Sequence, residues 1–576
     1  MKPLYDALRG YSSKVSAVFH MPGHKLGRGF IHDGSFDNPA LLDVTELEET
    51  DDLNCPRGPL REAQEMAARA FGAGKTWFLT NGSSCGIFAM IAANCDAGQK
   101  LLIAGDFHYS AFNAMRFSRV KPIYISIDKT TAGANGYTDA SYGILSPESV
   151  EKTLFEHPDA AALYLTRPGY YGSVCDIAEI VRLAHKRGIP VLVDEAHGAH
   201  LVFSNRLPIC ALEGGADYCV QSAHKTLPAF TQCAYAHVSE NRLASAGAGA
   251  DRFTEAVRAF QTSSPSFILT ASLDYAREYM SERGAAELDR ILDNCESFYI
   301  DMAKLGYGIP GDYLPQTKRT GGSPARYNRD ITRLVITTRP LGISGSEAER
   351  LLWSRYRIKI EMSEPRRIIM IATVADKDED FAKLKSALTE IALEQKKRIN
   401  SCEAPSGAAG TRALDRSGDE NYSDDDDGCE AGICAFNRGD SDGYDGGRAG
   451  THAVDDGGGD GKDGGDGHGA GSGNDGDTIA YAYDNSDAVS THTFDCGASF
   501  PDFITELHAP KCKIPLVTAV NRTAADIIAP YPPGIPLLCP GERITGDVIN
   551  EIRFLLQTGV HIKGIDTTDM TITVYR

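Results

Sequence analysis

Three short segments carry side chains that could act together in catalysis, and each follows an apolar stretch. SAHKT, at residues 222–226, puts Lys225 directly after an apolar run, and IPVLVD ends on Asp194, 31 residues upstream. TNGSSCG, at residues 80–86, lies between a predicted strand and a predicted helix. The amine of a lysine can attack an electrophilic carbonyl carbon, and a carboxylate can pair with a cation. A turn rich in hydroxyl groups can bind an anion.

These three chemistries fit pyridoxal phosphate (PLP). A carboxylate at the end of a buried strand is costly without a cationic partner. The protonated pyridine nitrogen of PLP is such a partner for Asp194, and its proton makes the ring an electron sink. Hydroxyl and backbone N–H groups at a helix N-terminus would bind the phosphate, which points to Ser83 and Ser84. A helix cap or a buried salt bridge is the alternative role for Asp194.

The order of the segments narrows the fold. A phosphate turn, then an aspartate strand, then a lysine strand is specific for the aspartate-aminotransferase-like class (fold type I) of PLP enzymes. His108, in AGDFHYSAF, follows another predicted strand between the turn and Asp194. An aromatic ring commonly stacks on PLP at this place in that class, so we expect His108 to stack on the cofactor. A core or surface histidine is the alternative.

The surrounding elements have the pattern that such a site requires. From about residue 60 to 240, predicted helices such as REAQEMAARAFGA (61–73) alternate with apolar strands such as IPVLVDEAH (189–197). This alternation is typical of an α/β fold with a mainly parallel sheet that is covered on both faces. In such folds ligands bind at the carboxyl edge of the strands. From about 285 to 398 the pattern predicts a smaller α+β domain.

The composition divides the chain into four parts. We expect an N-terminal segment with the large PLP-binding domain over 1–284, a small α+β domain over 285–399 and a C-terminal α+β domain over 491–576. Residues 400–490 are dominated by Gly, Asp, Ser and Ala. Such a composition cannot bury enough apolar surface to offset its ordering entropy, so it predicts a disordered insert. A calcium-binding repeat is the alternative, but no nonapeptide period is present.

Charge and composition exclude several classes of protein. The formal net charge is −20, and residues 412–487 alone hold about 20 acidic and 5 basic residues. The rest is nearly balanced, which argues against nucleic acid as a partner. The sequence begins without a signal peptide's apolar core and has no transmembrane run, so we expect a cytoplasmic protein with no membrane partner. Cys429 and Cys434 have no second pair nearby, so no metal site is expected.

Eight segments resemble the Orn/Lys/Arg decarboxylases of bacterial type, in their short form without an N-terminal receiver-like domain. They are FHMPGHKLG (19–27), DVTELEETDDLNCPRGPLREAQ (43–64), FLTNGSSCG (78–86), DFHYS (106–110), VDEAHGAH (193–200), SAHKTLPAFTQ (222–232), QTSSPSF (261–267) and APYPPGIPLLCPGERIT (529–545). The resemblance spans nearly the whole chain apart from the acidic insert. It implies a fold type I enzyme with a C-terminal decarboxylase domain, which converts a basic amino acid to CO₂ and a di- or polyamine precursor.

The resemblance also implies roles for the residues near the cofactor. Lys225 matches the Schiff-base lysine, Asp194 the partner of the pyridinium nitrogen and His108 the stacking ring. His224 precedes the lysine and is a candidate for phosphate contact or proton delivery. His197 matches a position near the face of the cofactor.

Further residues match the phosphate site and the substrate entrance. Ser83, Ser84 and Ser222 match phosphate ligands. Ser263 and Ser264 match a segment that reaches the cofactor phosphate of a neighbouring subunit, so a homodimer or a higher homo-oligomer with shared sites is implied.

Two further positions concern the substrate entrance. Glu542, in PGE, matches an acidic residue near the entrance that could pair with the distal cationic group of the substrate. Arg57 departs from the family, because an acidic residue is expected there in many relatives.

Three alternatives remain open at this stage. Another fold type I activity, such as an aminotransferase or an aldolase-type lyase, would share Asp194 and Lys225 but not the C-terminal segment. A catalytically dead paralogue would lack the cofactor residues, which are all present. The substrate is arginine, lysine or ornithine, and family analogy ranks them in that order.

Overall fold

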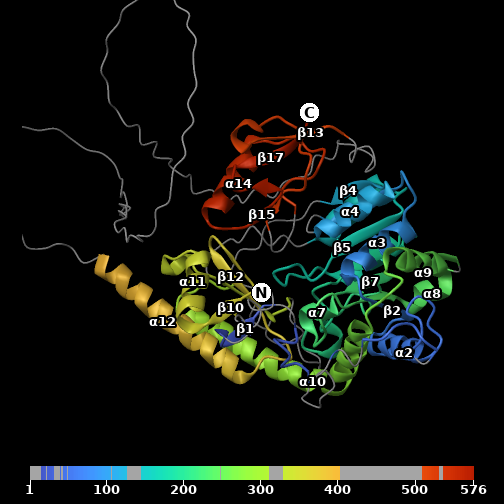
Figure 1. Ribbon diagram of the computed structural model, residues 1–576, viewed down its shortest axis with the longest axis horizontal. Helices are drawn as coiled ribbons and strands as arrows, with labels where there is room; N and C mark the ends of the chain where they lie inside the picture. The colour runs from blue at the N-terminus through green and yellow to red at the C-terminus, as the bar shows by residue number, and fades with distance from the viewer. Residues whose placement is uncertain are drawn as a thin grey trace, which may run out of the picture. The chain divides into compact units, whose positions relative to one another are not determined.

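A seven-stranded sheet forms the centre of the large domain (Figure 1). In sheet order its strands are β2 (Lys75–Leu79), β8 (Ala234–Val238), β7 (Tyr218–Gln221), β6 (Val191–Asp194), β5 (Ala162–Thr166), β3 (Lys100–Ala104) and β4 (Lys121–Ile125). β7, β6, β5, β3 and β4 pair in parallel, whereas β8 is antiparallel to both of its neighbours. The predicted mainly parallel sheet is confirmed.

The computed structural model describes residues 14–20, 23–30, 39, 43–48, 50–104, 107–125, 145–246, 248–310, 329–402, 509–530 and 536–576. All of them belong to one unit, which comprises residues 1–404 and 486–576. The predicted insert lies outside the described residues from 403 onward, and so do Cys429 and Cys434. The prediction of disorder is therefore not tested.

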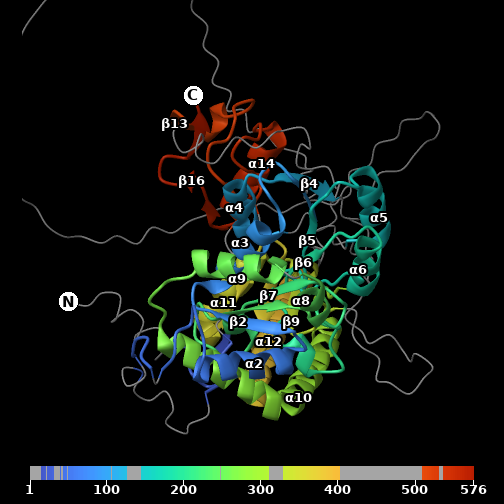
Figure 2. The ribbon, with the colours of Figure 1, turned by 90° about the vertical axis from the view of Figure 1, so that its right-hand side faces the viewer.

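Helices cover both faces of the sheet (Figure 2). The helices of this part are α2 (Pro59–Phe71), α3 (Gly82–Asn94), α4 (Tyr109–Ser118), α5 (Pro147–Glu156), α6 (Ile177–His185), η2 (Leu201–Phe203), α7 (Ala223–Thr226), α8 (Glu240–Ala246) and α9 (Ala248–Phe260). Along β3, Leu101 and Ile103 pack in the same apolar cluster as α3, α4 and α9, while Leu102 packs with α5 and α6. Alternate side chains of a strand thus face the helices on opposite sides of the sheet. Because both sides are covered, the strands are apolar throughout.

The long helix α10 (Phe267–Lys304) leads out of the large domain. It is followed by β9 (Arg333–Thr337), η3 (Arg339–Leu341), α11 (Gly345–Tyr356), β10 (Ile358–Ile360), β11 (Met362–Glu364), β12 (Arg367–Ile371) and α12 (Asp378–Cys402). β11, β12 and β9 form an antiparallel sheet, and β1 (Ala17–Phe19) pairs in parallel with β10. Helix α10 is continuous across the predicted boundary between 284 and 285, and the domain limits stay predictions.

The C-terminal residues have an apolar core of their own. Their elements are β13 (Lys511–Pro515), η4 (Leu516–Thr518), β14 (Ala529–Pro530), α14 (Gly546–Gln557), β15 (Ile562–Lys563), β16 (Ile565–Asp566) and β17 (Thr571–Tyr575). Ile549 and Ile552 of α14 pack against Val574 of β17 in this core.

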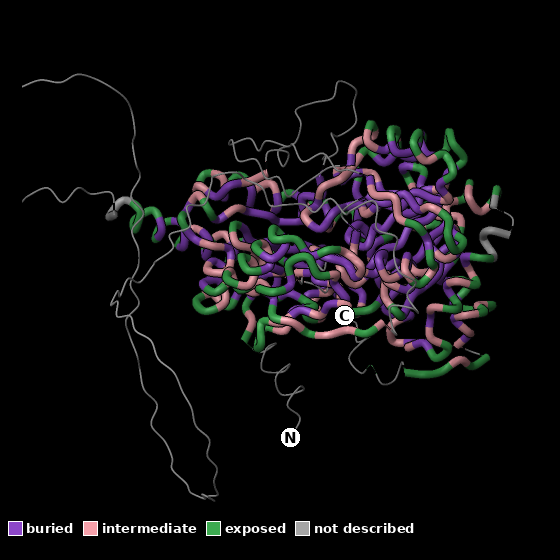
Figure 3. Tube along the Cα trace, turned by 90° about the horizontal axis from the view of Figure 1, so that it is seen from above, coloured by how far each residue is buried: buried purple, intermediate pink, exposed green. Residues whose placement is uncertain are grey.

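Burial follows the arrangement of the elements (Figure 3). Most residues of the large sheet's strands are buried, but in the edge strand β4 only Ile125 is. Within the described part of the chain, no helix combines the length and the apolar character that crossing a membrane requires.

Candidate active site

Asp194 and Lys225 meet at the carboxyl edge of the large sheet. Asp194 is the last residue of β6, and Lys225 lies in the short helix α7 that follows the neighbouring strand β7. Because adjacent parallel strands end at the same edge, the two charged side chains are brought together. Burial lowers the pKa of the Lys225 amine to about 8, although the negative charge of Asp194 opposes this shift.

The Asp194 carboxylate is almost fully buried, at 1% exposure. It accepts hydrogen bonds from the Tyr164 hydroxyl at 3.1 Å and from the backbone N–H of Ala196 at 3.0 Å. The charge of Lys225 acts on this carboxylate, and the role of Asp194 stays a prediction. Burial raises the pKa of Asp194, and the nearby Lys225 charge opposes the shift. Such a carboxylate can accept a hydrogen bond from the protonated nitrogen of a ring.

The predicted phosphate turn forms the start of helix α3. Ser83 and Ser84 lie in its first turn, after Gly82, whose φ is 74°. The Ser222 hydroxyl, which is fully buried, donates a hydrogen bond to the Ser83 hydroxyl at 2.9 Å. The structure therefore gathers hydroxyls from two distant segments beside a helix N-terminus, where an anion is favoured.

The helix α3 can lie close to the sheet because of Gly86. A Cβ at this position would come within 2.8 Å of Val220 Cγ2 and 2.9 Å of Leu79 Cδ1. With a larger residue here, either these side chains or the helix would have to shift. The glycine of the sequence motif thus has a packing role.

His108 lies immediately before helix α4 and caps it. Its Nδ1 accepts the backbone N–H of Ser110 at 3.2 Å and is 2.7 Å from the Ser110 hydroxyl. Burial lowers the pKa of His108 to about 3, and the nearby positive charge of Lys225 adds to the shift. The ring is therefore neutral and near Lys225, as stacking on PLP requires, but stacking itself stays a prediction.

His197 contacts Lys225 directly. Its Nε2 is 3.0 Å from Lys225 Nζ, and its Nδ1 is 2.9 Å from Nη2 of Arg333. The ring of Tyr170 packs edge-on, with 5.2 Å between the ring centroids. Burial lowers the pKa of His197 well below its usual range, and the charges of Lys225 and Arg333 contribute. The structure places His197 beside Lys225, and its position near the cofactor face stays a prediction.

His224 binds the backbone of Cys233 through Nδ1. Nδ1 is 2.9 Å from the backbone carbonyl oxygen of Cys233, which can only accept, so Nδ1 carries the proton. Burial lowers the pKa of His224 to about 4, and the nearby charge of Lys225 contributes. At neutral pH the other ring nitrogen therefore has a lone pair and no proton.

For the remaining predicted residues, the contacts observed do not involve Lys225. Ser263 and Ser264 are exposed in the turn before α10. The Glu542 carboxylate accepts the backbone N–H of Cys539 at 2.7 Å, within its own turn. Arg57 is exposed, and its backbone N–H donates to the Asp51 carboxylate at 2.8 Å. The roles given to these residues stay predictions.

Three residues of the site were missed by the sequence reasoning. Arg333, at the start of β9, is fully buried and binds His197. The hydroxyl of Tyr170 donates to Oε1 of Glu361 at 2.9 Å, and the negative charge of Glu361 acts on Lys225. The one sequence signal was an arginine at the start of the otherwise apolar strand RLVIT.

An N-terminal segment joins the turn that holds Lys225 to the small sheet. The backbone N–H of Gly23 donates to the carbonyl of His224 at 2.7 Å, and the Gly23 carbonyl accepts from the Thr373 hydroxyl at 2.9 Å. A Cβ on Gly23 would come within 2.6 Å of the Leu227 carbonyl oxygen. This close approach explains a glycine in the FHMPGHKLG motif.

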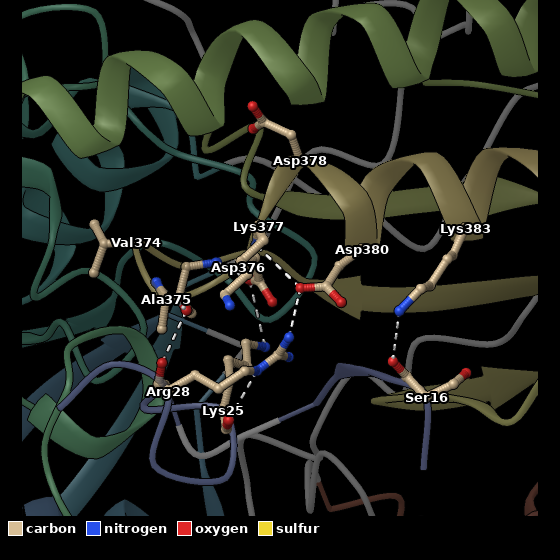
Figure 4. Close-up of polar contacts among 12 residues, drawn as sticks. Ser16, Lys25, Arg28, Val374, Ala375, Asp376, Lys377, Asp378, Asp380 and Lys383 are labelled. Atoms are coloured by element: carbon tan, nitrogen blue, oxygen red, sulfur yellow. Dashed lines mark hydrogen bonds and ion pairs between the residues drawn. The ribbon is translucent and has the colours of Figure 1, made fainter. Parts of the chain in front are cut away.

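The next residue but one, Lys25, anchors that segment (Figure 4). It is fully buried, donates to the Ile371 carbonyl at 2.7 Å and lies 3.8 Å from the Asp376 carboxylate. Arg28 forms a second ion pair with Asp380, at 2.6 Å (Figure 4). Two ion pairs and two backbone contacts thus fix the segment beside the site.

The groups at the strand ends fit PLP. The two serine hydroxyls at the N-terminus of α3 suit the phosphate, the buried carboxylate of Asp194 suits a protonated ring nitrogen, and the Lys225 amine can reach a reactive carbonyl carbon. The neutral ring of His108 completes the set. No part of this donor set conflicts with the cofactor.

Comparison with known proteins gives the family. Residues 2–308 match the family model described as Orn/Lys/Arg decarboxylase, major domain, and residues 499–567 match the one for its C-terminal domain. The chain is 35% identical over 401 residues to the arginine decarboxylase of Bacillus subtilis (strain 168), which covers 68% of this chain and 77% of that protein. It is 29% identical over 586 residues to the arginine decarboxylase of Bacillus anthracis, covering 100% of this chain and 96% of that protein.

Among solved structures, the Francisella novicida lysine decarboxylase has a similar fold. The TM-score is 0.61 at 16% sequence identity, and the match covers 100% of this chain and 81% of that one. At this identity the likeness concerns the fold, which agrees with the fold type I class expected from the sequence. Taken with the two family matches and the site at the carboxyl edge of the sheet, these findings show that the chain belongs to the Orn/Lys/Arg decarboxylase family.

Proposed function

We propose that this chain is a PLP-dependent decarboxylase of a basic amino acid and that arginine is its substrate. The main support for this reaction is the position of the Lys225 amine, which lies 3.0 Å from Nε2 of His197 and beside the buried Asp194 carboxylate. Membership of the family supports a basic amino acid as the substrate. Arginine is favoured because a relative that matches along the whole chain is an arginine decarboxylase.

Different residues around Lys225 would bind different parts of the cofactor. Ser83, Ser84 and Ser222 would hold the phosphate at the start of α3. Asp194 holds the ring nitrogen in its protonated form, because a buried carboxylate is stabilised by a cationic neighbour. Bound PLP supplies the electron sink that accepts the electrons of the bond to CO₂. Lys225 would be the residue that holds the cofactor through its amine.

Proton delivery to the substrate carbon falls to Lys225 rather than to His224. At neutral pH the only ring proton of His224 is on Nδ1 and is donated to the Cys233 carbonyl. The Lys225 amine, with a pKa of about 8, exchanges a proton readily near neutral pH. His197 touches this amine and keeps it oriented.

The cationic side chain of the substrate needs a carboxylate. Glu361 acts on Lys225 through its charge and is oriented by the Tyr170 hydroxyl, so it joins Glu542 as a candidate partner for the guanidinium group. Ser263 and Ser264 are exposed, which suits the proposed contact with the cofactor of a neighbouring subunit in a homodimer.

Decarboxylation is tested by measuring CO₂ release and kcat/KM with arginine, lysine and ornithine in parallel. We expect release from all or some of these, with the highest kcat/KM for arginine, and loss of both activity and visible cofactor absorbance in Lys225→Ala. Keto-acid-dependent transfer of the amine without CO₂ would instead establish an aminotransferase. A chain that binds no PLP at all would contradict the proposal entirely.

A further inference from the structure

The hydrogen bond between Arg333 and His197 fixes where the imidazole carries its proton. A guanidinium group has five N–H donors and no acceptor. Nη2 of Arg333 lies 2.9 Å from His197 Nδ1 and 3.3 Å from the His197 carbonyl oxygen, so it binds both the ring and the backbone. Nδ1 must therefore accept, and the proton of the neutral ring is on Nε2.

The tautomer of His197 decides the form of the lysine next to it. Nε2 is 3.0 Å from Lys225 Nζ. When Nε2 carries the proton, it donates, and the amine must accept with its lone pair. An ammonium group has three donors and no lone pair, so it cannot make this bond. The contact thus requires the neutral amine of Lys225, which is the form that attacks a carbon atom.

We propose that Arg333 is a positioning residue for Lys225: by holding the proton of His197 on Nε2, it stabilises the neutral, nucleophilic form of the lysine amine. The inference rests on the proposed role of Lys225 as the lysine that binds the cofactor. Arg333 belongs to the small sheet, and its observed hydrogen bonds link it to Lys225 through His197.

The neighbours of Arg333 keep it in place for this role. Its guanidinium lies 3.9 Å from the Asp330 carboxylate, and both side chains are fully buried. Tyr170 packs edge-on against the His197 ring and restricts its rotation. The ring therefore cannot turn to exchange its two nitrogen atoms without displacing several buried groups.

Other charged groups around Lys225 act in both directions. Asp194 at the end of β6 and Glu361 between β10 and β11 favour the ammonium form, whereas burial and the charge of Arg333 favour the amine. The imidazole rings of His108 before α4 and of His224 in α7 are neutral at pH 7 and add no charge. The two carboxylates thus oppose the neutral amine that the contact with His197 requires.

The state of the amine can be read without substrate or cofactor. The full-length chain is stripped of PLP and labelled with a trace of acetic anhydride over a range of pH, and acetylation of Lys225 is followed by mass spectrometry. In the wild-type chain we expect the labelling midpoint near pH 8. The exposed Lys186 serves as the control within the same sample.

Four variants separate the hydrogen-bond chain from a simple effect of charge. Arg333→Met is expected to slow Lys225 labelling at pH 7 by about tenfold, which corresponds to a midpoint about one pH unit higher. His197→Phe, in which the Arg333 charge is kept, should slow it similarly. In the His197→Phe background, Arg333→Met should slow labelling by much less than tenfold, because the hydrogen-bond chain is already broken and only the charge of Arg333 is still lost. Arg333→Lys keeps the charge and a donor and should recover part of the rate.

The proposal is overturned if the effects of Arg333→Met and His197→Phe on the labelling of Lys225 are additive. If Arg333→Met slows labelling equally in the wild-type and His197→Phe backgrounds, Arg333 acts by charge alone. Should Arg333→Met fail to fold, His197→Phe decides: unchanged labelling of Lys225 refutes the hydrogen-bond chain. A failure of the proposed function would show differently, as absent CO₂ release by the wild-type enzyme with the labelling pattern intact.

Discussion

The hydroxyl oxygens of Ser83 and Ser222 lie 2.9 Å apart, although 139 residues separate them in the chain. Ser83 belongs to the first turn of α3, and Ser222 immediately precedes the short helix of Lys225. The contact joins the predicted phosphate turn to the lysine turn. The two ends of one cofactor would thus be held by adjacent parts of the structure.

Removing these hydroxyls is expected to weaken cofactor binding. A hydrogen bond to a charged group contributes about 1.5–3 kcal/mol, so Ser83→Ala and Ser222→Ala should each raise the Kd for PLP roughly tenfold to a hundredfold. Equilibrium dialysis against PLP measures this. The control is Ser281→Ala, because the Ser281 hydroxyl donates to a carbonyl within α10. An unchanged Kd in both variants would contradict the assigned phosphate site.

Two adjacent carboxylates should behave differently on neutralisation. Asp194→Asn removes the charge that holds the ring nitrogen protonated, and we expect PLP to stay bound while CO₂ release falls by about 10²–10³-fold. Glu195 is the matched control, since it is fully buried and accepts from the Ala211 N–H at 2.8 Å and the Gln221 amide at 2.7 Å.

Glu195→Gln should therefore act on stability. It places an amide donor against the Gln221 amide and leaves the buried Arg167 without its carboxylate partner at 3.8 Å, so it should lower the free energy of unfolding by about 3–5 kcal/mol. Activity per folded enzyme should change far less than in Asp194→Asn. Urea unfolding and CO₂ assays on both variants make the comparison, and equal losses of activity would show that Asp194 has no special electronic role.

The buried pair of Lys25 and Asp376 should contribute strongly to stability (Figure 4). Lys25→Met leaves the Asp376 carboxylate buried without its cation, at a cost of about 3–5 kcal/mol in the free energy of unfolding. Lys25→Met/Asp376→Leu should recover part of this loss, because no lone charge remains.

The urea midpoint measures the effect of these changes. Arg61→Ala is the control, since Arg61 and Glu65 form an exposed pair at 3.5 Å that should contribute only about 0–1 kcal/mol. A double variant less stable than Lys25→Met would show that the packing of the two stems, rather than the charge, dominates.

Asp330 should make stability depend on pH in the acid range. Burial raises its pKa, but the contacts with His200, Arg333 and Thr332 outweigh this and hold the pKa at about 2, against an ordinary value of 3.8. Between these values the unfolded chain binds more protons than the folded one. The stabilisation from Asp330 is therefore complete above pH 4 and is lost as the pH falls towards 2.

Asp330→Asn should remove this contribution. We expect a loss of roughly 2 kcal/mol at pH 7 and a smaller difference from the wild-type chain at pH 3. Urea midpoints of both proteins at pH 7, 5 and 3 measure the two curves. A difference that stays constant over this range would mean that Asp330 stabilises the fold by hydrogen bonding and not through its charge.

The sequence by itself determined the large sheet and the residues at its carboxyl edge. Apolar strands that end in Asp194 and in the turn of Lys225, with the serine turn before α3, follow from patterns within a few residues of each other. Parallel strands bring such ends to one edge whatever the details of packing. For the same reason the family motifs in these segments could be recognised without a structure.

Tertiary structure alone decided which groups surround the lysine. Arg333 binds His197 across 136 residues of sequence, and Glu361 is oriented by Tyr170 across 191. These contacts depend on how the small sheet packs against the strand ends, and no local pattern encodes that. The tautomer of His197, and with it the form of the Lys225 amine, became readable only once the donors around each nitrogen atom were in place.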